Sequence, residues 1–338
     1  MSSIEPATLE RASRRRTALV LIAIGLILVS GFAGLTVGRH HSLRPPTTGS
    51  PPAIPHGMQP ISFHGMQLFV PASWPKHNTD CGIPISDTAI IEIGFEETCY
   101  FSPHPRGLTV LRLTTSDTPE GRARAMVATD PVVVDGRPAR RGVGVPPGEV
   151  TRLDVLVVPT VGVVASVEAP DLRISHRILD TARVVPIDSY GCTDKVTSLR
   201  PSAPSRRTGA ERELVPGDPS TAAICFYTGN WLGGSVRLSE TQMRELGRTL
   251  NALPQGVSFP GSGSPDRPAE CLADSQRGYI ARFGFRSGPD LDVYIHISGC
   301  NGLSASNGPR TTKIDAHLVT LLSIAGYDGS FPDPTKLQ

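Results

Sequence analysis

The stretch Leu153–Val167, LDVLVVPTVGVVASV, decides the fold of the first half of this chain. Its two halves, 153–158 and 162–167, are apolar and rich in β-branched residues, a composition typical of strands. The stretch therefore predicts two strands in a domain that is rich in antiparallel sheet.

Apolar segments on both sides of this stretch extend the predicted sheet. The segments 61–63 and 66–70 flank His64-Gly65, a two-residue connection in which glycine can take a positive φ, so they predict a hairpin. The turn explains His64 without assigning it to a ligand. Further strands are expected at 89–94, 108–114 and 131–134, the last turning at Asp135-Gly136 into another strand.

Two helices are expected between these strands. The first begins at Thr118-Pro119-Glu120, which provides a capping hydroxyl, a proline in the first turn and an acid near the positive end of the helix. The second covers 171–183, where Ile174, Ile178 and Ala182 fall on one face and should pack on the sheet.

The second half begins near Tyr190-Gly191-Cys192 and repeats the mixture of strands and helices. Ser239 and Gln242 form a predicted capping box at the start of a helix with an apolar stripe. The remaining elements expected there are strands at 222–227, 234–238, 278–285 and 291–298 and a final helix at 313–324. The predicted fold class is α+β, with two small domains that each combine an antiparallel sheet, packed helices and disulfides.

Two parts of the chain resemble known groups. The order of a hairpin leading to VPASW, then strands, then the helix ILDTARVV resembles the PsbP-like fold over residues 58–185. The succession of CFYTG, ELGRTLNALP, a lone cysteine, a hairpin and SGC over residues 191–324 is similar to a module of uncharacterised exported actinobacterial proteins. Both resemblances concern fold only, so they imply no functional residue.

Thr17–Gly38, TALVLIAIGLILVSGFAGLTVG, carries no charge over 22 residues and is long enough for a helix that spans a bilayer. Arg14-Arg15-Arg16 precede it, which places the N-terminus in the cytoplasm. A cleaved signal peptide is the alternative, but no clean Ala-x-Ala site follows. We therefore expect a retained signal anchor in the plasma membrane, with the C-terminal domains outside the cytoplasm.

These observations divide the chain into five parts. The cytoplasmic stub and the proline-rich spacer flank the membrane segment, and the two domains follow. The expected parts are the stub at 1–16, the transmembrane helix at 17–38, the spacer at 39–57, the PsbP-like domain at 58–187 and the disulfide-stabilised domain at 190–328.

The charge of the exported part argues against a nucleic-acid partner. Beyond residue 44 the chain carries 27 Lys and Arg against 29 Asp and Glu, so a broad basic face is not expected. Arginine outnumbers lysine by 29 to 4, a bias typical of GC-rich genomes such as those of actinobacteria.

All six cysteines follow the membrane segment, in a compartment where disulfides persist. Cys81 and Cys99 share the first domain and are expected to pair. Cys271 and Cys300 flank a predicted hairpin and can approach each other, which leaves Cys192 with Cys225, although four cysteines permit three pairings. The absence of CxxC spacing and of a histidine cluster favours structural bridges over a metal site.

Signature motifs of several common enzyme classes are missing from the sequence: GxSxG, HExxH, Walker A and GxGxxG do not occur. The nearest candidate polar site consists of His77, Asp80 and His104, where a histidine near a carboxylate can act as a base or ligand. A solvated loop held by a disulfide also explains these residues, and this is the preferred interpretation. His296 is expected on the outer, polar face of a sheet.

Two hypotheses for function remain. The first is a non-enzymatic binding or interaction protein of the cell envelope, with an envelope protein or wall polymer as partner, the membrane contacted through 17–38, and no cofactor or metal. The second is a cell-wall-processing hydrolase whose residues come from distant loops.

Overall fold

The stretch that opens the sequence analysis forms an antiparallel pair of strands, β9 (Leu153–Val158) and β10 (Val163–Glu168). The computed structural model describes residues 51–76, 79–80, 83–92, 107–256, 277–297 and 303–324. Both strands are buried on both faces over almost their whole length, as expected for apolar, β-branched segments at the centre of a sheet. The prediction of two adjacent strands is confirmed.

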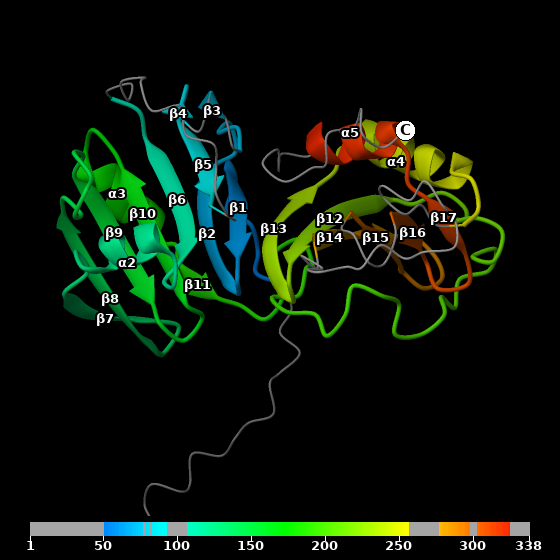
Figure 1. Ribbon diagram of the computed structural model, residues 1–338, viewed down its shortest axis with the longest axis horizontal. Coiled ribbons are helices and arrows are strands. Elements are labelled where there is room, and N and C mark those ends of the chain that lie inside the picture. The colour runs from blue at the N-terminus through cyan, green and yellow to red at the C-terminus, as the bar shows by residue number, and fades with distance from the viewer. Residues whose placement is uncertain are drawn as a thin grey trace, which may run out of the picture. The chain divides into compact units, whose positions relative to one another are not determined.

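β9 and β10 are the central strands of a six-stranded sheet (Figure 1). Its neighbours are antiparallel except for β5 and β6, which run parallel. The order across the sheet is β5 (Thr88–Ile91), β6 (Val110–Thr115), β10, β9, β8 (Arg137–Gly144) and β7 (Asp130–Val134).

A three-stranded sheet contains the predicted hairpin, β1 (Met58–Phe63) and β2 (Met66–Pro71), with β11 (Arg183–Val184) at its edge. His64 and Gly65 have φ values of 49° and 82°, the left-handed pair that a tight two-residue turn requires. The hairpin prediction is confirmed. A further pair of two-residue strands is formed by β3 (Thr79–Asp80) and β4 (Ile83–Pro84).

The second half of the chain forms another six-stranded sheet, antiparallel throughout. Its order is β13 (Trp231–Arg237), β12 (Thr221–Thr228), β14 (Arg277–Gly284), β15 (Leu291–His296), β16 (Ser304–Ser306) and β17 (Thr311–Lys313).

Four helices occur in the described residues: α2 (Pro119–Ala125), α3 (Leu172–Leu179), α4 (Glu240–Ala252) and α5 (Ala316–Ile324). The predicted caps are confirmed, since Thr118 caps α2 and a full capping box joins Ser239 to Gln242 at α4. α3 ends four residues before the predicted end at Arg183, because Arg183 and Val184 pair with β2 instead.

The predicted α+β fold class is wrong. The described structure is mostly β, with 41% strand and 15% helix. The reason is that the helices are short, from 7 to 13 residues, whereas strands supply most of the buried apolar positions. The prediction therefore gave the packed helices too large a share of the fold.

The six-stranded sheet of β12 to β17, which we call the third sheet, shows how both faces of one sheet are covered. α4 and α5 lie side by side over one face (Figure 1), which carries Phe226, Tyr279 and Phe283. The opposite face carries Cys225 and Tyr227, and the segment before β12 covers it through Cys192, Leu199 and their neighbours. Neither face is left to solvent at the centre of the sheet.

Within the described residues, no helix combines the length and hydrophobicity needed to cross a membrane. The predicted stub at 1–16, the predicted anchor at 17–38 and the first part of the spacer at 39–57 lie outside the described residues. Gly49–Gln338 form one compact unit. The predicted domain boundaries at 187 and 190 stay a prediction.

Candidate functional site

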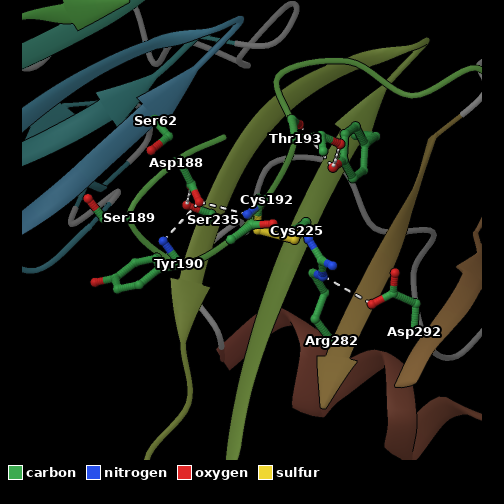
Figure 2. The surroundings of a disulfide bond; sticks show 12 residues. Ser62, Asp188, Ser189, Tyr190, Cys192, Thr193, Cys225, Ser235, Arg282 and Asp292 are labelled. Atoms are coloured by element: carbon green, nitrogen blue, oxygen red, sulfur yellow. Dashed lines mark hydrogen bonds and ion pairs between the residues drawn. A yellow bond between two sulfur atoms is a disulfide. The ribbon is translucent and has the colours of Figure 1, made fainter. Parts of the chain in front are cut away.

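A disulfide and a buried carboxylate organise the segment that leads into the third sheet (Figure 2). Cys192 and Cys225 are bonded, with their Cα atoms 5.6 Å apart, and neither is exposed. The predicted pairing of these two cysteines is confirmed. Complete burial shields the two sulfur atoms from thiols in solution, so this bridge is structural.

Asp188 fixes the turn before the disulfide. Its Oδ1 accepts hydrogen bonds from the backbone N–H groups of Tyr190 (2.9 Å) and Cys192 (2.8 Å), and its Oδ2 accepts from Ser235 Oγ on β13. Both oxygens are engaged and the residue is 1% exposed, so Asp188 holds the segment against the sheet and is not available to a ligand.

Lys76 lies beside this carboxylate. Its Nζ donates a 2.9 Å hydrogen bond to the backbone oxygen of Ser235 and stands 5.8 Å from the centre of the Tyr190 ring. Burial lowers the pKa of Lys76 from 10.5 to about 8, while the negative charge of Asp188 acts in the opposite direction. The Lys76 amine contacts a backbone oxygen, and the Ser235 hydroxyl donates to Asp188, so the two do not form a nucleophile and base pair.

A second group of a serine, a histidine and an aspartate consists of Ser175, His176 and Asp154. The Asp154 side chain is fully buried. Ser175 Oγ lies 3.1 Å from Asp154 Oδ2 and His176 Nε2 lies 3.5 Å from the same oxygen. A hydrolytic triad needs the serine hydroxyl on the imidazole and the serine open to substrate. Here the hydroxyl faces the carboxylate and Ser175 is fully buried, so the set is structural.

The described surface contains a groove of about 740 Å³ at one end of the third sheet. It is formed by the first residues of β12, the last residues of β13, the first turns of α4, the hairpin after β14 and the segment before β12. Its lining residues are Arg207, Asp218, Pro219, Ser220, Thr221, Ala222, Arg237, Leu238, Glu240, Met243, Arg244, Phe285, Arg286 and Ser287. We call it the arginine groove because four arginines line it.

The side chain of Arg207, which lines the arginine groove, is held in place by several contacts. Its guanidinium carbon lies 3.2 Å from the centre of the Phe285 ring. Its Nε donates to the backbone oxygen of Pro216 (3.0 Å), and its Nη1 reaches those of Ser287 (3.2 Å) and Pro289 (3.1 Å). One side chain thus ties the segment before β12 to the hairpin after β14.

The other arginines of the groove are exposed. Arg244 pairs with Glu240, one turn earlier on α4. Among the described residues, no ion pair engages Arg237 or Arg286. The lining therefore presents positive charge that the protein itself only partly neutralises.

His64 lies outside the groove, in an aromatic stack. Its ring centre is 4.2 Å from that of Phe63 and 5.4 Å from that of Trp231, and Lys195 Nζ lies 4.5 Å from the Trp231 ring centre. Its backbone N–H donates to Leu232 O at 2.8 Å. Burial lowers the pKa of His64 from 6.5 to about 4, against a smaller opposing effect of Asp117.

The depressed pKa of His64 predicts that the protein loses stability as the pH falls from 6.5 to 4. Over this range the unfolded chain binds a proton at His64 and the folded chain does not, so proton uptake favours unfolding by at most about 3 kcal/mol. Urea unfolding of the wild type and of His64→Asn across this range measures the effect, because asparagine tolerates the positive φ of the turn.

The wild type should lose more stability than His64→Asn as the pH is lowered. His56→Gln is the control, since it removes an exposed histidine away from this aromatic stack. Parallel pH profiles for the wild type and His64→Asn would contradict the prediction.

The sequence-predicted polar site stays a prediction. His77 and His104 lie outside the described residues, and of Asp80 the structure describes only its place in β3. Cys81, Cys99, Cys271 and Cys300 also lie outside, so their pairings stay predictions. In the part of the chain that is described, no three His, Cys, Asp or Glu side chains gather as metal ligands would.

His296 is more deeply buried than its predicted place on an outer, polar face implies. It does lie on the outer face of its sheet, as predicted, but it is only 8% exposed. Its partner across the ladder is Gly278, and Leu199 Cδ1 lies against Gly278 from outside. The segment before β12 covers this face, which alternation within one strand cannot reveal.

The arginine groove itself was missed at the level of sequence. Its arginines come from the segment before β12, from β13, from α4 and from a hairpin turn, and no local spacing connects them. The only sequence signal near the groove was the Pro/Ser/Arg-rich composition of 200–220, which is typical of a linker.

Comparison with known proteins adds no relative. No protein-family model, no curated protein and no solved structure matches this chain. The resemblance of residues 58–185 to the PsbP-like fold stays a prediction.

Proposed function

We propose that this protein is a non-enzymatic binding protein of the cell envelope, anchored in the membrane through residues 17–38, and that its ligand occupies the arginine groove. The charge and size of the groove carry the proposal. A lining with four arginines and a volume of about 740 Å³ suits a small molecule or a segment of a chain.

The residue types in the groove favour binding over catalysis. Its described lining holds no histidine, cysteine or lysine, the side chains that most often act as bases or activated nucleophiles. The hydroxyl-bearing residues Ser220, Thr221 and Ser287 therefore have no histidine or lysine beside them within the described lining.

One observation supports a hydrolase as the second candidate. Asp218 and Glu240 line the same groove, and glycoside hydrolases use two carboxyl groups across a cleft. Such enzymes keep one carboxyl group protonated in apolar surroundings, whereas Glu240 is exposed and contacts the Arg244 guanidinium. The surroundings of Glu240 are those of a surface ion pair.

The test is crosslinking and affinity purification of the full-length protein from its native membranes, together with assays for wall-polymer binding and hydrolysis. We expect an envelope protein or wall polymer to be retained by the wild type and lost from Arg237→Ala/Arg286→Ala. The matched control is Arg140→Ala/Arg152→Ala, which removes two exposed arginines outside the groove.

Equal retention by both double variants would overturn the assignment of the groove. Hydrolysis of a wall polymer by the wild type, lost in Asp218→Asn, would replace the binding proposal with the hydrolase.

A further inference from the structure

We infer that the arginine groove recognises carboxylates, that its ligand is an acidic peptide segment, and that Glu240 is a carboxylate of the protein itself that competes with this ligand. The inference rests on the proposed binding function and names the chemistry of the ligand.

Two arginines are placed to meet the ligand directly. Arg237 ends β13 and Arg286 follows β14, so both extend from strand ends that line the groove. A guanidinium presents a planar fork of N–H donors that matches two carboxylate oxygens, which makes an exposed, unpaired arginine a suitable carboxylate receptor. Two such groups on one groove suit a ligand with more than one acid.

The groove is poorly suited to neutral sugars. Among the described lining residues, Phe285 is the only aromatic one, and Arg207 covers one face of the Phe285 ring. Because the three hydrogen bonds of Arg207 to backbone oxygens hold this arrangement, the face is not released without breaking them. Recognition by charge is therefore favoured over stacking.

The ion pair between Arg244 and Glu240 shows that a carboxylate can contact a guanidinium of the groove. A carboxylate already contacts a groove guanidinium there, on the first residue of α4. Both side chains are exposed, at 64% and 73%, and an exposed pair one helical turn apart is weak. A carboxylate of the ligand can therefore displace Glu240 at little cost, and Glu240 lowers affinity by occupying Arg244 and repelling acids.

The experiment is titration of the full-length protein in detergent with fluorescently labelled hexaglutamate, followed by anisotropy. We expect hexaglutamate to bind and hexaglutamine not to bind. Affinity should fall about tenfold in Arg237→Ala and in Arg286→Ala, and rise about threefold in Glu240→Gln. Added salt should weaken binding, as expected for exposed charges.

Glu245→Gln is the matched control for Glu240→Gln, because it removes the same charge from the same helix outside the groove lining. Its affinity should equal that of the wild type. Equal gains from both variants would show a general charge effect and overturn the role of Glu240.

Two further outcomes overturn the carboxylate assignment. Tripolyphosphate serves as an unlabelled competitor, and stronger binding of tripolyphosphate than of hexaglutamate would mean a phosphate site. If hexaglutamate does not bind while Arg237→Ala/Arg286→Ala still loses the envelope partner, the inference fails and the proposed function stands. If the partner is also unaffected, both fail.

Discussion

Replacing Asp154 by alanine is expected to lower the free energy of unfolding by about 3 kcal/mol, because it removes a fully buried carboxylate and leaves the partly buried Arg141 with only its exposed partner Asp180. The Asp154 side chain is fully buried and accepts two hydrogen bonds from Arg141, at 3.0 Å from Nε and 2.7 Å from Nη2. Ser175 also loses its contact to the carboxylate. Urea unfolding followed by circular dichroism measures the loss.

Asp180 provides the matched control for this prediction. It pairs with the same guanidinium through Nη1, but its side chain is 64% exposed. Since exposed ion pairs contribute little, Asp180→Ala should cost about 1 kcal/mol or less. A cost of that size for Asp154→Ala as well would contradict the prediction.

A double variant separates the loss of the pair from the burial of one charge. Arg141→Met/Asp154→Leu replaces both charges by apolar groups, so no charge is left without a partner. We expect it to recover most of the stability lost in Asp154→Ala, because a buried ion pair contributes little compared with well-packed apolar residues.

The elements that depend on neighbouring residues could be predicted from the sequence. The turn at His64-Gly65 and the capping box of Ser239 and Gln242 have their signals within four residues, and the structure contains both. The fold class could not be predicted as well. Helix patterns were recognised, but their short length and the dominance of strands in the core depend on how distant segments pair.

The buried network around Asp154 illustrates the same limit. The sequence places one acid in an apolar strand and gives no reason for its burial. Its partners come from β8 and α3, 13 residues before it and 21 residues after it. Whether a buried charge at such a position has a partner depends on contacts with distant segments. The periodicity within β9 therefore cannot reveal the partners of Asp154.

The arginine groove was beyond prediction for a related reason. Arg207, Arg237 and Arg286 are separated by 30 residues or more and reach one surface only because β12, β13 and β14 are neighbours. The predicted polar site, by contrast, was chosen from residues expected near one predicted disulfide of the first domain, and that criterion could not lead to a groove in the second half of the chain.

Removing the disulfide by Cys192→Ala/Cys225→Ala is expected to lower the free energy of unfolding by about 3–4 kcal/mol, on the basis of the loop entropy that the cross-link removes from the unfolded chain. The bonded residues are 33 positions apart. Substitution is preferred to chemical reduction, which would also act on any bridges among the other four cysteines. Urea unfolding of the purified full-length protein measures the change.

The slope of the unfolding free energy against urea tests the origin of this loss. An unfolded chain without the cross-link is more extended and exposes more surface, so the slope should increase. Tyr227→Phe is the matched control: it removes the hydrogen bond from Tyr227 Oη to the backbone oxygen of Thr193, which joins the same two segments without a covalent bond. It should cost about 1 kcal/mol and leave the slope unchanged. A loss in the double variant no greater than that of Tyr227→Phe, with an unchanged slope, would show that the hydrogen bonds of Asp188 hold the segment without help from the disulfide.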